Sequence, residues 1–245
     1  MAQTAQAPTR PAAEVIRQAH VSQASSGVCY ASIGEIPIGA TELERMVNTV
    51  PLSVAGALHR KAYYFVPLTV SHGDETLIAE RYDVALSENA VCHRNFAAGD
   101  SQCVFISTRL MDDKFSIAFE FFINVAHAFL EHVGVSSQFS ELVWKQAHDG
   151  VRGETSLDAW ELRKLATAPS GDSERAKSEY FQAAFSDAIA VYMLATFLDV
   201  DYYDLRERDY PLLAPAALAE RLRLVHQLFP SNPGYDFAVY YRRKA

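Results

Sequence analysis

This chain of 245 residues has few cysteines and no hydrophobic run of membrane length. Its three cysteines are odd in number and form no Cys-x-x-Cys pair, which disfavours a disulfide framework and favours a reducing compartment, so we expect a cytoplasmic location. The N-terminus lacks the apolar segment of a signal peptide. The longest apolar stretch, residues 115–135, is broken by side chains such as Glu120 and Glu131, so we expect no membrane partner.

Basic residues are also scarce. Lysine and arginine number 22 against 30 acidic residues, the net charge is -8, and no basic block stands out, so we expect no nucleic-acid partner. Hydrophobic residues make up 49%, enough for a sizeable core. There is no internal repeat or low-complexity linker. We expect a flexible N-terminal segment, residues 1–25, followed by a single domain, residues 26–245.

The first half of that domain, residues 26–110, has mixed signals. A short helix is expected at residues 13–24, and Thr41 with Glu44 forms a capping box for a helix beginning near Glu42. Pro51 ends or kinks that helix, and a second helix follows to Lys61. Aromatic and β-branched runs predict strands at 62–70 and 102–108, with an extended segment at 88–95 and a loop at 95–101.

The second half, residues 111–245, reads as helical. Asp112 or Asp113 caps a helix reaching His132, in which apolar residues recur at helical spacing. Further helices are expected at 137–148, 157–167, 175–199 and 215–228. Strands followed by helices predict the α+β class, with a small N-terminal mixed sheet, a long helix and a helical C-terminal lobe.

The long helix carries one polar stripe on an otherwise apolar surface. Its members, three or four residues apart, are Glu120, Asn124, His127 and Glu131. Buried polar groups are costly unless they find partners, so the stripe predicts a metal, a ligand or other polar side chains nearby. The best source of partners is the helix near residue 179, which is apolar except at Glu179, Gln182, Ser186 and Asp187.

Two segments resemble motifs of zinc metallopeptidases. VAHAFLEHVG is similar to the HExxH helix of zincins, and SEYFQAAF is similar to the second motif of the anthrax lethal factor-like and Pro-Pro endopeptidase-like gluzincins. The spacing between the segments is also similar. The resemblance covers roughly residues 62–230 and implies a zincin-like fold.

The resemblance implies metal ligands at His127, at Glu131 in place of the second histidine, and at Glu179. It also implies losses, because Ala128 stands where the general-base glutamate belongs and Ala183 replaces a second glutamate. The tyrosine that usually precedes the second motif has no counterpart in residues 168–177. A second alignment, on a thermolysin-type ExxxD motif ending at Asp187, would place Ala183 at the third-ligand position.

These changes favour three hypotheses. The first is a pseudopeptidase that binds a peptide or protein without cutting it, because a general base contributes roughly 10²–10⁴-fold and alanine cannot replace it. The second is a metal-dependent enzyme of other chemistry, in which His127, Glu131 and Glu179 hold one zinc, iron or manganese ion and the ligand is a peptide, protein or small molecule. The third is a structural protein in which these groups form ordinary hydrogen bonds. Cys92 with His93 is a weaker candidate for a nucleophile and its base.

Overall fold

The structure is a computed structural model that describes residues 8–73, 75–111, 113–168, 173–198 and 210–238. The chain divides into two compact units, each described here by itself. Unit 1 comprises Met1–Val50 and Leu58–Asn124, and unit 2 comprises Pro51–Ala57 and Val125–Ala245. Strands and helices together confirm the mixed α and β class predicted from the sequence.

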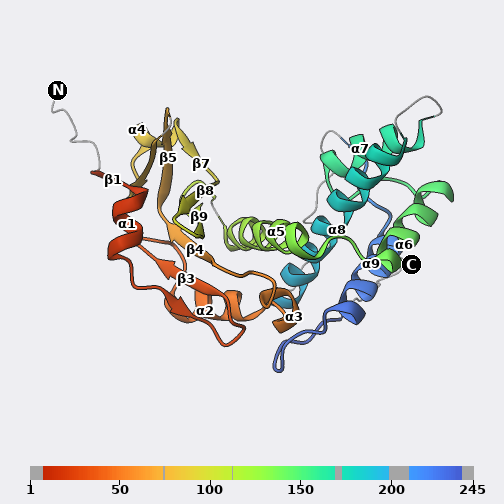
Figure 1. The fold of residues 1–245 in the computed structure, drawn as a ribbon, viewed down its shortest axis with the longest axis horizontal. Helices are drawn as coiled ribbons and strands as arrows, with labels where there is room; N and C mark the ends of the chain where they lie inside the picture. The colour runs from red at the N-terminus through yellow and green to blue at the C-terminus, as the bar shows by residue number, and fades with distance from the viewer. Residues whose placement is uncertain (1–7, 74, 112, 169–172, 199–209, 239–245) are drawn as a thin grey trace, which may run out of the picture. The chain divides into compact units, whose positions relative to one another are not determined.

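Unit 1 is built on two small sheets (Figure 1). The five-stranded sheet has the order β2 (Ser22–Gln23), β3 (Cys29–Ser32), β4 (Lys61–Val66), β9 (Ser101–Ser107) and β8 (His93–Ala98). Its three central strands are parallel, and β2 and β8 pair antiparallel at its edges. The four-stranded sheet is antiparallel, in the order β1 (Thr9–Pro11), β6 (Glu75–Ala79), β5 (Leu68–His72) and β7 (Ala90–Val91).

The helices of unit 1 are α1 (Ala12–Gln18), α2 (Ala40–Asn48), α4 (Val84–Ser87) and the first part of α5 (Lys114–Val133). The central strands β4 and β9 of the five-stranded sheet are buried on both faces along most of their length. On one face, the ring of Tyr63 meets that of Phe121 on α5 edge to face, with centroids 5.1 Å apart. On the other face, Tyr64 and Phe105 pack in one cluster with Val15 of α1. Successive side chains of a strand point to opposite faces, so each central strand contributes apolar side chains to both.

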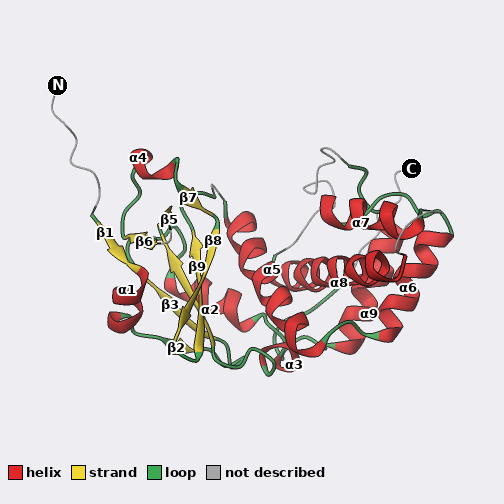
Figure 2. Cartoon of the chain, turned by 45° about the horizontal axis from the view of Figure 1, so that its top comes forward, coloured by secondary structure: helices red, strands yellow, loops and turns green. Residues whose placement is uncertain are grey.

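Unit 2 is helical in its described residues (Figure 2). It contains α3 (Leu52–Ala55), the rest of α5, α6 (Ser137–His148), α7 (Leu157–Thr167), α8 (Ser173–Phe197) and α9 (Pro215–Leu228). The helices predicted at 137–148, 157–167 and 215–228 are confirmed. Gly153, in the connection before α7, has a φ of +77°, and a Cβ there would lie 2.0 Å from the carbonyl oxygen of Leu212, so only glycine fits.

Several predicted elements of unit 1 were wrong. The single strand expected at 62–70 is two strands in different sheets, because Pro67 has no N–H for a ladder and separates β4 from β5. The loop expected at 95–101 is mostly strand: β8 runs to Ala98 and turns through two residues into β9. Strand β6 was not predicted.

The predicted capping box was also wrong. Helix α2 begins at Ala40 after Gly39 and has no side-chain cap, so Thr41 lies inside its first turn. After Pro51 the helix is only α3, which ends at Ala55 instead of continuing to Lys61.

The N-terminal segment and the division of the chain also differ from the expectation. Within residues 1–25, described from residue 8 onward, β1, α1 and β2 form, and Ala12 and Val15 are buried in the core. The chain passes from unit 1 to unit 2 after Asn124, within α5, and Pro51–Ala57 also belong to unit 2, whereas the sequence suggested one domain with halves divided between residues 110 and 111.

Candidate functional site

Helix α5 carries all four residues of the polar stripe. It begins after Asp113, whose carboxylate accepts a hydrogen bond from the Ser116 N–H at 2.7 Å, confirming an aspartate cap. Phe122, Val125 and Phe129 are fully or almost fully buried. The stripe itself changes character along the helix: Asn124 is buried in unit 1, whereas His127 and Glu131 are exposed in unit 2.

The third predicted ligand, Glu179, lies on α8 and has an arginine partner. The Nε of Arg175, one turn earlier, donates to its carboxylate at 2.8 Å. Among the described residues no group of three or more His, Cys, Asp or Glu side chains is placed to hold a metal ion. The three predicted ligands His127, Glu131 and Glu179 are therefore not gathered into one such group.

Ala128, which occupies the position that the resemblance assigns to a general-base glutamate, faces inward. Ala128 is 2% exposed, and its carbonyl oxygen lies 3.1 Å from Nδ1 of His132 on the next turn. This leaves no accessible carboxylate at the motif position where a peptidase would activate water.

A polar cluster that the sequence reading did not assemble joins β8 to the first part of α5 in unit 1. Nδ1 of His93 lies 2.5 Å from a carboxylate oxygen of Glu120, and the Asn124 amide donates to the same oxygen at 3.2 Å. Contact with Glu120 holds the imidazole of His93 at the start of the edge strand. These groups satisfy the part of the polar stripe that lies in unit 1.

Cys92 does not have the character of a nucleophile. Burial, and secondly the negative charge of Glu120, raises the pKa of the Cys92 thiol above its ordinary value. Reactive cysteines need the opposite shift, since the thiolate is the attacking species. The arrangement therefore gives no support to Cys92 and His93 as a catalytic pair.

Strand β8 has an open edge. In the described part of the chain, no strand pairs with β8 on the side away from β9. Cys92 pairs opposite Ser107 and accepts its N–H at 2.8 Å, and bonding alternates along an antiparallel ladder. The backbone groups of His93, Asn95 and Ala97 therefore point outward, and the side chains of these three residues are also exposed.

Unit 2 contains a buried ionic network. Arg221 of α9 donates to both carboxylate oxygens of Glu154, at 2.7 and 3.2 Å, and both residues are 0% exposed. The hydroxyl of Tyr180 donates to Glu154 at 2.5 Å, Arg163 lies 3.3 Å from the same carboxylate, and Gln146 accepts from Arg221 at 2.8 Å. Because Glu154 and Arg221 have no exposed surface, this network holds helices together and is not a binding site.

Asp187 is the second buried acid of unit 2. Its carboxylate accepts a hydrogen bond from the Thr155 hydroxyl at 2.8 Å. Burial raises the pKa of Asp187 to about 6, although hydrogen bonds from Ser156 and Thr155 act in the opposite direction. Asp187 is thus a structural group of α8, and its raised pKa lies in a pH range where protein stability is readily measured.

Comparison with protein-family models, with curated proteins and with solved structures found no match. No helix among the described residues is long and apolar enough to cross a membrane. The open edge of β8 is exposed at His93, Asn95 and Ala97.

Proposed function

We propose that this protein is a pseudopeptidase, which binds an extended peptide or protein segment along β8 without cutting it. The observation that carries the proposal is the outward-facing backbone of His93, Asn95 and Ala97 on an edge strand. Such an edge offers N–H and C=O groups to an added strand, and exposed alternate side chains supply specificity.

The motif positions on α5 and α8 support a role without catalysis. Ala128 supplies no general base, and its position is buried. Glu179, the expected third ligand, has a cationic partner in Arg175. The zincin-like fold and the metallopeptidase ancestry are part of this same proposal and rest on the sequence resemblance.

Replacing Asn95 with proline provides the test. The N–H of Asn95 points away from β9, so Asn95→Pro keeps the β8–β9 ladder but removes a donor from the open edge and places a ring there. Peptides enriched from a displayed random-peptide library on the wild-type protein should bind Asn95→Pro at least about 10-fold more weakly, as expected from losing one or two backbone hydrogen bonds. Fluorescence anisotropy with a labelled enriched peptide measures the change.

Asn95→Ala is the matched control, since it removes the same side chain but keeps the outward N–H. It should retain binding within about 3-fold, apart from any contact of the amide itself. Equal binding by Asn95→Pro and wild type, or failure of the library to yield any peptide, would contradict strand addition at β8.

A metal-dependent enzyme is the second candidate, and one observation favours it: His127 and Glu131 lie four residues apart on α5 and are both exposed. Elemental analysis after titration with zinc, iron(II) and manganese tests it. About one metal per chain in the wild type, lost in Glu131→Ala, would move this candidate ahead of the pseudopeptidase. Equal, substoichiometric metal in both proteins would remove it.

A further inference from the structure

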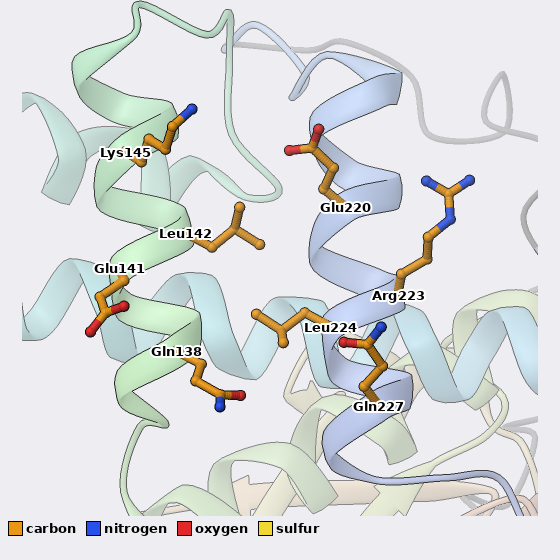
Figure 3. Close-up of a pocket in the computed structure, with 8 residues that line it drawn as sticks. All are labelled: Gln138, Glu141, Leu142, Lys145, Glu220, Arg223, Leu224 and Gln227. Carbon is orange, nitrogen blue, oxygen red and sulfur yellow. The ribbon is translucent and has the colours of Figure 1, made fainter.

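A groove on unit 2 runs between α6 and α9 (Figure 3). Each helix contributes four lining residues with the same spacing, namely Gln138, Glu141, Leu142 and Lys145 from α6, and Glu220, Arg223, Leu224 and Gln227 from α9. Spacing of three, four and seven residues is that of one helical face over two turns. Both helices thus present matching stripes, each with one leucine among polar and charged side chains.

The two stripes run in opposite directions and are level with each other. The amide of Gln146 donates to the carbonyl of Ala217 at 3.2 Å and to the carboxylate of Glu220 at 3.0 Å, which fixes the end of α6 beside the start of α9. In Figure 3, Lys145 and Glu220 lie at one end of the groove and Gln138 and Gln227 at the other. Leu142 and Leu224 point towards each other in the middle.

Each side of the groove carries one acid and one base, and each charge has a charge of opposite sign across the groove. Lys145 is level with Glu220, and the pKa of Lys145 is raised mainly by the hydrogen bond and charge of Asp149 and also by Glu220. Glu141 lies on the outer side of α6, and Arg223 lies on the outer side of α9. All four charged side chains of the groove belong to exposed residues.

We propose that a second copy of this chain docks on the groove through a two-fold axis that runs along it. A rotation about this axis places α9 of the second copy opposite α6 of the first. It leaves each residue's position along the groove unchanged, so each residue of α6 faces the residue of α9 that lies at the same height in the other copy. Glu141 then faces Arg223 of the second copy, Lys145 faces Glu220, and the leucines close the centre.

The resulting four helices are antiparallel to every neighbour, which is a favourable arrangement of helix dipoles and bundle packing. A partner with charges of one sign would meet one repelling residue on each side of the groove, whereas a second copy meets a charge of opposite sign at all four positions. The stripes are two turns, or roughly 10 Å, long, so the interface is smaller than a standard one and the dimer is weak and sensitive to salt.

A charge-exchange experiment tests the dimer in the full-length protein. Sedimentation equilibrium at low salt, at concentrations up to about 1 mM, should show reversible dimerisation of the wild type. Glu141→Arg and Arg223→Glu should each weaken it at least about 10-fold, because each places like charges across the axis. The double variant should return to within about 3-fold of the wild type, because the exchanged charges again face their opposites.

Glu161→Arg on α7 is the control, since it makes the same change of charge at an exposed residue away from the groove and should leave dimerisation unchanged. Thermal unfolding of each variant separates lost association from lost folding. The proposal is overturned if the wild type stays monomeric throughout, or if the single variants dimerise like the wild type. It is also overturned if the single variants are folded but the double variant does not regain dimerisation.

Discussion

Replacing Arg221 with methionine is expected to lower the free energy of unfolding by about 3–5 kcal/mol, because it leaves the buried carboxylate of Glu154 without its two-bond partner. Methionine keeps much of the side-chain volume, so the loss reports charge pairing more than a cavity. Tyr180 and Arg163 still contact Glu154, but neither replaces two charged hydrogen bonds in a site with no exposed surface. Urea unfolding followed by circular dichroism measures the change.

The matched control is Arg175→Met on α8. Arg175 also pairs with a glutamate, Glu179, at 2.8 Å, but its side chain is 78% exposed. Exposed pairs contribute at most about 1 kcal/mol, so this variant should unfold almost like the wild type. A loss for Arg221→Met no larger than that for Arg175→Met would mean that the network is not what holds the helices of unit 2 together.

The second large effect concerns pH and Asp187. Because burial raises its pKa from 3.8 to about 6 in the folded protein, the folded state binds the proton more tightly than the unfolded state does. Stability from this group is therefore fully present below the unfolded pKa and is lost as pH rises through about 6. Asp187→Asn, which mimics the protonated form, should raise stability at neutral pH by roughly 2–3 kcal/mol and change it little near pH 4.

The exposed Asp158 in the first turn of α7 provides the comparison. Asp158→Asn should lower stability by at most about 1 kcal/mol, through the helix dipole alone, and should not stabilise the protein at any pH. If Asp187→Asn destabilises the protein equally at acid and neutral pH, the carboxylate is ionised in the folded state and its hydrogen bonds to Thr155 and Ser156 outweigh burial.

Long periodic helices were the part of the fold that the sequence predicted well. α9 begins at Pro215 and ends at Leu228, as expected, because Pro is favoured in the first turn and the apolar spacing is regular. Short elements in unit 1 were predicted less well. β4 and β5 read as one apolar run, and their assignment to different sheets follows from Pro67 and from pairing with distant strands, which local pattern does not encode.

The candidate site was predictable only in part. The spacing of polar residues predicted the stripe on α5. Its partner His93 lies on β8, most of which was expected to be a loop. Arg221 carried a usable signal, because it occupies a position between the buried Leu218 and Val225 on the apolar face of α9. Its partner Glu154 had none, since it lies in an irregular connection whose backbone pairs with the distant residues Pro211 and Leu213.

We propose above that this protein binds an extended peptide and leaves it intact. The most direct measurement is mass spectrometry of an enriched, tightly bound peptide after incubation with zinc-supplemented protein, alongside His127→Ala. We expect the same intact peptide with both proteins, and we expect Asn95→Pro to weaken its binding. Cleavage by the wild type that disappears in His127→Ala would contradict it and would show a working metallopeptidase despite Ala128.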